Sequence, residues 1–216
     1  MMKRITVLAG LALALAGCGD GAPKGRGVYM LLDTSGTYTV ELAQAQRVIN
    51  AVLARLDAGD SFAVASIDTG SFSEKDIVAK VTFDDRPSVA NQQKRQFHEQ
   101  VNAYVKGVKP SPYTDISGGL LQAIEYLNEK DPGEKTILIF SDLKEELAKG
   151  YKRKDLTLGL DKVNVVALNV TKLRTDNMDP REYLARVEHW QKRVEKGGGS
   201  FRVINDMDRL ERILGG

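Results

Sequence analysis

Residues 27–33 read GVYMLLD, an apolar run that carries no charge until it ends on Asp33. A strand with one face in water alternates apolar and polar side chains, whereas a strand covered on both faces is apolar along its length. The stretch therefore predicts a buried strand of a parallel sheet, with Asp33 at its carboxyl end.

The rest of the chain alternates between apolar runs and helical periodicity. We expect further strands at residues 62–67, 77–83, 135–141, 162–169 and 201–204. We expect helices at residues 39–56, 88–106, 115–129, 181–196 and 207–214. The apolar face of the helix at 181–196 should consist of Tyr183, Leu184, Val187, Trp190 and Val194. Residues 107–114 read as a loop, and the charged residues 143–160 favour a loop followed by a short helix.

Strands that alternate with amphipathic helices indicate the α/β class. We therefore expect one domain at residues 27–216: a doubly wound, mostly parallel six-stranded sheet with helices on both faces. In such sheets ligands bind beyond the carboxyl ends of the strands, where the strand order reverses. Polar side chains at those ends are the first candidates for a site.

The N-terminus has the pattern of a secretory signal. Lys3 and Arg4 precede an almost unbroken apolar run at residues 5–16, which is shorter than the roughly 20 residues of a spanning helix. The run ends in Leu15-Ala16-Gly17-Cys18, which resembles the lipobox of bacterial lipoproteins. That resemblance implies a lipoprotein signal peptide at residues 1–17 and lipid on Cys18, the only cysteine. An ordinary signal peptide that contains a cysteine is the alternative.

A lipid on Cys18 would place the protein in the bacterial cell envelope. Residues 18–26 form a short Gly-rich tether of at most ~25 Å, so the domain is expected close to its membrane. Gly19 after the cysteine favours the periplasmic face of the outer membrane over the inner membrane. Without Lys3 and Arg4, 29 basic residues face 29 acidic ones, and this balance argues against a nucleic-acid partner.

Three stretches place oxygen-bearing side chains at the expected strand ends: DTSGT at 33–37, PYTD at 112–115 and SD at 141–142. Together they offer two carboxylates and three hydroxyls, on Asp33, Ser35, Thr37, Thr114 and Asp142. Hard oxygen ligands of this kind suit Mg²⁺ or Mn²⁺. The residue after Thr114, Asp115, is better placed to cap the following helix.

These three motifs, in this order and on these elements, resemble the von Willebrand factor A domain. Its metal-ion-dependent adhesion site, or MIDAS, is written D-x-S-x-S, followed later by a Thr and an Asp. The resemblance covers roughly residues 27–214 and implies the strand order 3-2-1-4-5-6, with a short antiparallel third strand at the edge.

The resemblance also implies a role for each residue of the site. Asp33 would hold metal-bound water and Ser35 would ligate directly. Thr37 stands where the family usually has its second Ser; it keeps the hydroxyl and adds a methyl group. Thr114 matches the switchable Thr ligand and Asp142 the distal Asp. One metal position stays open for a carboxylate of a partner protein, which implies a binding module and not an enzyme.

The sequence supports three other interpretations of the function less well. A metal-free scaffold module of an envelope assembly keeps the fold without the ion. Aspartic proteases share D-T-G-like turns with residues 33–36 and 67–71, but they are all-β; the turn at 68–70 is better read as a polar turn on the same rim. A metal-dependent hydrolase, such as a phosphatase of the haloacid dehalogenase type, is a less favoured alternative, because its motif needs a second Asp where Ser35 stands.

The basic run Lys152-Arg153-Lys154 follows the last of these motifs, so we expect it near the metal face. A run of this kind is usually a solvated charged loop. It is also a candidate contact for an acidic partner or for anionic lipid, where each basic residue contributes ~1 kcal/mol.

Overall fold

The computed structural model describes residues 25–36, 41–68, 73–153, 156–170, 180–206 and 209. Several predicted features lie outside these residues: the signal peptide, Cys18, most of the tether and Thr37. Of the helix expected at 207–214, only residue 209 is described.

The centre of the fold is a six-stranded sheet in the order β3-β2-β1-β4-β5-β6. Its strands are β1 (Arg26–Leu32), β2 (Ser61–Ser66), β3 (Ile77–Thr82), β4 (Glu134–Phe140), β5 (Val163–Leu168) and β6 (Ser200–Ile204). Neighbouring strands are parallel except β3, which pairs antiparallel with β2 at the edge. The expected strands, their order and the antiparallel edge are confirmed.

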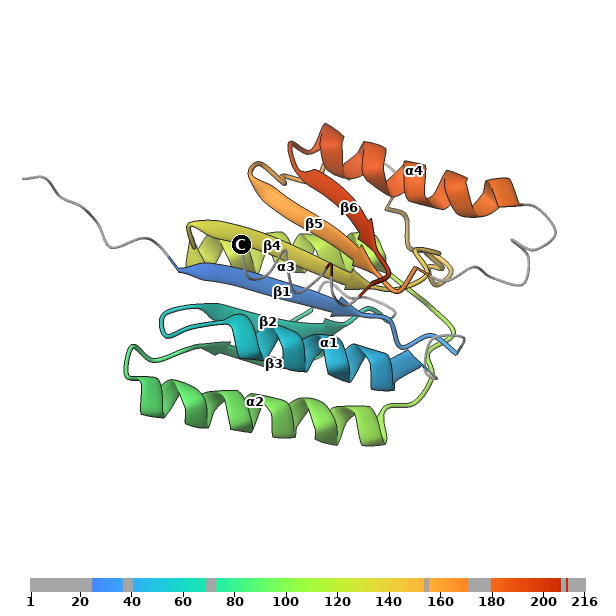
Figure 1. Ribbon diagram of the computed structural model, residues 1–216. Helices are drawn as coiled ribbons and strands as arrows, with labels where there is room; N and C mark the ends of the chain where they lie inside the picture. The colour runs from blue at the N-terminus through green and yellow to red at the C-terminus, as the bar shows by residue number, and fades with distance from the viewer. Residues whose placement is uncertain are drawn as a thin grey trace, which may run out of the picture.

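Helices cover both faces of this sheet, as expected (Figure 1). They are α1 (Leu42–Arg55), α2 (Pro87–Gly107), α3 (Ile116–Lys130) and α4 (Pro180–Lys196), with a 3-10 turn η2 (Glu74–Asp76) before β3. One apolar cluster lies between the sheet and α1 and α2, and a second lies between the sheet and α3 and α4. The result is a three-layer domain with two cores.

Strand β1 supplies side chains to both cores in alternation. Met30 and Leu32 pack toward α1 and α2, whereas Tyr29 and Leu31 pack toward α3 and α4, and all four are fully buried. Successive side chains of a strand point to opposite faces, so only an apolar run can be buried on both. The prediction for residues 27–33 is therefore confirmed.

Two details of the prediction are wrong. Leu184 was expected on the inner face of α4, but it is 62 % exposed. It lies about 100° further round the helix than Tyr183, on the side away from the buried Trp190. The short helix expected within residues 143–160 is absent from residues 143–153 and 156–160, which are described. That segment bridges to Thr114 at Glu146 and buries Leu158 and Leu160 instead.

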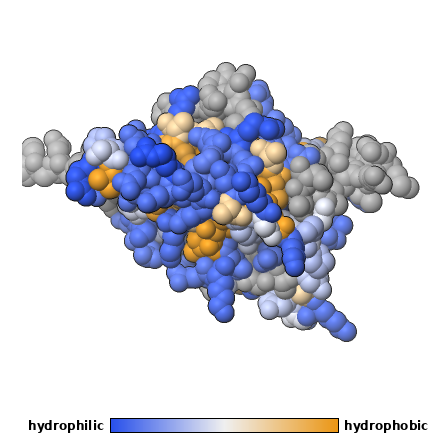
Figure 2. Space-filling view, turned by 90° about the horizontal axis from the view of Figure 1, so that it is seen from below, coloured by the Kyte–Doolittle hydropathy of each residue, from blue (hydrophilic) through white to orange (hydrophobic). Residues whose placement is uncertain are grey.

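The outer face of α2 shows no large apolar surface. Figure 2 views the molecule from the side where α2 lies in Figure 1, and this face is mainly hydrophilic with small separate hydrophobic patches. Isolated apolar side chains of this kind are common on protein surfaces. In the part of the chain that the structure describes, no helix combines the length and hydrophobicity needed to cross a bilayer.

Candidate metal centre

The carboxyl ends of β1 and β4 bring two of the predicted motifs together. The two strands are parallel neighbours with Leu32 opposite Phe140, and the Asp33 amide donates to the Phe140 carbonyl at 3.0 Å. The residues that follow each strand, Asp33 and Ser141, therefore leave the sheet side by side. The Ser141 hydroxyl donates to Asp33 Oδ2 at 2.6 Å.

Asp33 is fully buried and is the hub of the site. Its Oδ1 accepts a hydrogen bond from the Ser35 amide at 2.8 Å and a longer one from the Thr114 hydroxyl at 3.4 Å. With Ser141 on Oδ2, one carboxylate connects the loops after β1 and β4 and the loop before α3. A buried carboxylate needs such donors, because each replaces a water molecule that burial removes.

Backbone pairing holds these loops in place. Ser35 bridges to Ser111, where the Ser111 amide donates to the Thr34 carbonyl at 2.8 Å. Thr114 and Glu146 exchange backbone hydrogen bonds of 2.8 and 2.9 Å. Isolated backbone bridges thus hold two of the candidate ligands, Ser35 and Thr114, in place.

Asp142 is the second buried carboxylate, at 3 % exposed. Its Oδ1 accepts from the Lys144 amide at 2.8 Å, and its backbone carbonyl accepts from Arg186 Nε at 3.2 Å. The pKa of Asp142 is raised to about 6, by burial first and then by the nearby charge of Asp33, against the hydrogen bond from the Lys144 amide. Burial also raises the pKa of Asp33, opposed by its hydrogen bonds from Ser141, Ser35 and Thr114.

These residues fit a hard divalent cation in their chemistry. Two buried carboxylates that repel each other are costly to ionise, and a cation between them would offset that cost. The described residues contain no cluster of three His, Cys, Asp or Glu side chains that could hold a metal. A metal site at the rim would therefore need hydroxyl groups as ligands beside the two carboxylates, and the predicted ligand set includes such groups. The structure gathers Asp33, Ser35, Thr114 and Asp142; their role as metal ligands stays a prediction, and Thr37 is not described.

Ser141 was missed as a site residue, although it was part of the quoted SD motif. The contact of Ser141 with Asp33 depends on the register of β1 and β4, which cannot be predicted from the sequence alone. Arg186 was also missed, because it approaches Asp142 from α4, more than 40 residues away.

Arg153 was expected in a solvated basic run, and this expectation is wrong. Its guanidinium forms an ion pair with Asp115 at 2.9 Å, and the two side chains are only 18 % and 1 % exposed. Lys152 beside it is exposed, and Lys154 lies outside the described residues. Arg153 itself lies near the candidate centre, as expected, because its partner Asp115 directly follows Thr114.

Asp115 also caps α3, as predicted. Its Oδ1 accepts from the Gly118 amide at 2.7 Å, which satisfies one of the free amides of the first helical turn. A Cβ at Gly118 would collide with this carboxylate, so the capping geometry requires glycine there. Just after the end of β2, the Ile67 carbonyl accepts from the Asp115 amide at 3.2 Å. Asp68 therefore follows β2 on the same rim, as expected.

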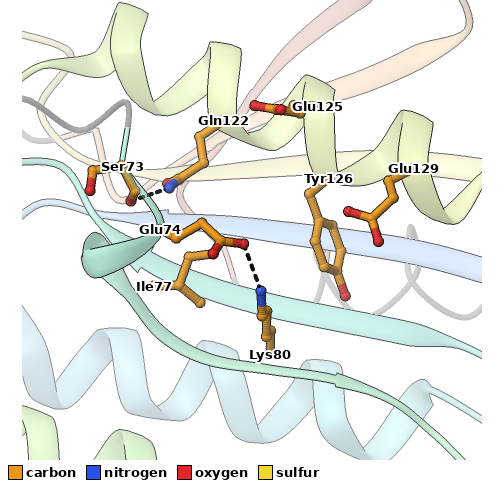
Figure 3. A pocket seen from close by; sticks show the side chains of 8 residues that line it. All are labelled: Ser73, Glu74, Ile77, Lys80, Gln122, Glu125, Tyr126 and Glu129. Carbon is orange, nitrogen blue, oxygen red and sulfur yellow. Dashed lines mark hydrogen bonds and ion pairs between the residues drawn. The ribbon is translucent and has the colours of Figure 1, made fainter.

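A hollow of about 240 Å³ lies away from this rim, between α3 and the edge strand β3 (Figure 3). Lys80 reaches from β3 toward Glu74 in an exposed ion pair of 3.0 Å, and Gln122 donates from α3 to the Ser73 carbonyl. Glu125 and Glu129 lie along its α3 side. The hollow sits on the flank of the sheet, and we assign it no ligand.

Comparison with solved structures agrees with this architecture. A von Willebrand factor type A protein from Catenulispora acidiphila aligns with 89 % of the chain at 14 % identity and a TM-score of 0.60. The pilus adhesin SpaC from Lactobacillus rhamnosus GG aligns with 89 % at 11 % identity and a TM-score of 0.55. The chain spans 42 % and 29 % of the lengths of these two proteins. Neither models of protein families nor curated proteins match the sequence.

The protein is therefore an α/β domain with a polar rim at the carboxyl ends of β1 and β4. Its fold is that of a von Willebrand factor A domain, as the sequence motifs indicated.

Proposed function

We propose that this domain binds a partner protein through a Mg²⁺ or Mn²⁺ ion at the rim of the sheet. The observation that carries the proposal is the pair of buried carboxylates, Asp33 and Asp142, among hydroxyl groups. Asp142 is 3 % exposed, and its pKa is raised by burial first and then by the charge of Asp33. Arg186 Nε donates to the Asp142 carbonyl at 3.2 Å, and the Lys144 amide donates to Asp142 Oδ1 at 2.8 Å.

Asp33, Ser35, Thr37, Thr114 and Asp142 are the residues that would hold the ion. Octahedral coordination by oxygen suits Mg²⁺, which keeps some ligands that are not protein side chains. The ion would supply a fixed positive charge to which a carboxylate of the partner can bind. Asp33 would position Ser35 and Thr114 through the hydrogen bonds that it already accepts from the Ser35 amide and the Thr114 hydroxyl. No catalytic step is assigned, because Ser35 stands where a phosphatase would need its acid.

The fold is compatible with a binding role. SpaC, one of the similar structures, is a pilus adhesin. That function belongs to SpaC and supports only the general idea that this fold serves protein binding at a cell surface. A partner carboxylate provides the specific chemistry of our proposal.

We further propose that lipid on Cys18 anchors the domain in the cell envelope, at the periplasmic face of the outer membrane. The short tether leads into Arg26, the first residue of β1, and the candidate metal centre lies at the other end of that strand. Seven residues at ~3.3 Å each separate the two ends by ~20 Å. The binding rim would thus point away from the membrane that holds the anchor.

Calorimetric titration of the full-length chain with MgCl₂ and MnCl₂ tests the metal. We expect saturable binding to the parent, loss of binding in Asp142→Asn, and unchanged binding in Asp85→Asn, an exposed aspartate far from the rim. Absence of binding by the folded parent would overturn the metal proposal. Partner capture that is unaffected by EDTA would then favour the metal-free scaffold.

A further inference from the structure

A groove of about 600 Å³ runs between α4 and the segment after β4, directly beside Asp142. Lys144 and Glu145 line it from that segment, and Ala185, Arg186 and Arg193 line it from α4. Arg186 connects the groove to the candidate metal centre, because its Nε donates to the Asp142 carbonyl at 3.2 Å. A chain that reaches the centre from this side would pass through the groove.

The groove carries an excess of positive charge. Three basic side chains line it, and Glu145 is the one carboxylate among the lining residues. Lys144 also forms an exposed ion pair of 2.8 Å with Glu146, so most of the excess comes from Arg186 and Arg193 on α4. Glu145 already accepts a hydrogen bond of 2.7 Å from the Ser117 amide, in the first turn of α3, where the helix dipole favours a negative charge. Arg193 donates to the Ser117 hydroxyl at 2.7 Å and to the Arg153 carbonyl at 3.3 Å, and both acceptors are uncharged.

The floor of the groove is apolar and well fixed. Trp190 is 1 % exposed, its Nε1 donates to the Leu143 carbonyl at 3.0 Å, and the Arg193 guanidinium lies 4.9 Å from its ring. His189 packs edge-on against Trp190, and burial followed by the Arg193 charge lowers the pKa of His189. Its ring is therefore biased toward the neutral form. An aliphatic side chain suits such a floor, and carboxylates suit the basic walls.

The position of the groove favours a protein over a lipid surface as its occupant. It lies at the carboxyl end of the sheet, whereas the chain enters β1 at the opposite end. A membrane that held the tether would face the entry end.

We infer that the groove between α4 and residues 143–145 binds an extended acidic segment of the partner, with carboxylates against the basic walls and an aliphatic side chain on the floor. This inference rests on the proposed function in assigning the segment to the partner that reaches the metal centre, and in the position of the anchor that argues against a lipid occupant. Binding in the groove itself requires no metal, so the two ideas fail separately.

The probe is a capped peptide of four glutamates around one leucine, titrated at low ionic strength into the full-length chain in detergent with EDTA present. Trp190 is the only tryptophan, so its fluorescence reports on the floor of the groove. We expect a saturable change with this peptide, no saturable change with the glutamine counterpart, and weaker binding as salt is added.

Two matched variants locate the binding. Ala185 is exposed and lines the groove, so Ala185→Glu adds a negative charge without removing a hydrogen bond. We expect it to weaken peptide binding by at least about tenfold, because like charges oppose each other across an interface. Ala103→Glu makes the same change on the exposed face of α2 and should leave binding within about twofold.

Equal binding of the glutamine peptide, or equal effects of the two Ala→Glu changes, would overturn the inference. So would the absence of any saturable response in the parent at low salt. Sedimentation with phosphatidylglycerol vesicles that is lost in Ala185→Glu but kept in Ala103→Glu would overturn it in favour of a lipid surface. Metal binding, measured by calorimetry on Ala185→Glu, is expected to persist in every case.

Discussion

The Ser141 hydroxyl donates to Asp33 Oδ2 at 2.6 Å, across the junction of β1 and β4 and with both residues fully buried. The bond connects residues 108 positions apart through one pair of neighbouring strands. It offsets part of the cost of burying the Asp33 carboxylate, and it fixes the direction in which Asp33 Oδ1 points.

Ser141→Ala should destabilise the protein by about 1–3 kcal/mol, because it leaves a buried charged acceptor without one donor. The measurement is urea denaturation at pH 7 in EDTA. Ser88→Ala, on the exposed start of α2, is the matched control and should cost less than about 0.5 kcal/mol. Equal stability of Ser141→Ala and the parent would show that the bond contributes nothing net.

Arg153→Ala should cost about 2–4 kcal/mol, because it leaves the buried Asp115 carboxylate without its ion-pair partner. Lys152→Ala, next to it and exposed, should stay within about 0.5 kcal/mol of the parent. Adding Asp115→Asn to Arg153→Ala should recover part of the loss. If the two single changes cost the same, Arg153 does not stabilise the fold through Asp115.

Stability in EDTA should fall as the pH rises from about 4 to 7, in part because of Asp76. Its pKa is raised to about 6 by burial first and then by the charges of Asp68 and Asp115. Between pH 4 and 6 the folded state holds this proton and the unfolded state has lost it, so raising the pH favours unfolding. The effect is discounted to about 1 kcal/mol or less because the side chain is only partly buried.

Asp76→Asn should remove that part of the slope in urea denaturation measured at several pH values. Asp85→Asn, on an exposed turn, should leave the slope as in the parent. A slope unchanged in Asp76→Asn would mean that Asp76 ionises at its ordinary pKa.

MgCl₂ should raise the thermal midpoint of the parent, because a ligand that binds only the folded state stabilises it. At a hundred times the dissociation constant the gain is about 2.7 kcal/mol. Asp33→Asn should lose this gain while still unfolding cooperatively, and NaCl at the same ionic strength controls for salt. The same gain in Asp33→Asn would place the ion elsewhere.

Cys18→Ala should move the protein out of the membrane fraction, either as a soluble exported form or as an uncleaved precursor. Fractionation followed by immunodetection measures this, and mass spectrometry of the parent should find acyl groups at its N-terminus. Unchanged membrane association of the variant would contradict the lipid anchor.

The fold was readable from the sequence because its strongest signals are local. A strand such as residues 27–33, apolar on both faces, leaves little choice of environment, and the helices between strands carry clear periodicity. The strand order came from resemblance and not from the residues themselves. Leu184 was misplaced because a spacing of one residue from Tyr183 suffices to turn a side chain away from the sheet.

The site was predicted only as far as its motifs extend. Asp33, Ser35, Thr114 and Asp142 follow expected strands or precede an expected helix, so their meeting follows from topology. Ser141 depends on strand register, and Arg153 and Arg186 approach from segments that carry no recognisable motif. Long-range side-chain partners of this kind are decided by tertiary packing, which a single sequence does not state.

The place of β1 also has a mechanical consequence. With an anchor at Cys18 and a partner held at the rim, tension would act along β1, which is paired in parallel with β2 on one side and β4 on the other. Such a pull shears both ladders at once, so their hydrogen bonds share the force and do not open one after another. Under such tension we expect the partner to dissociate from the rim before the sheet of the domain unfolds.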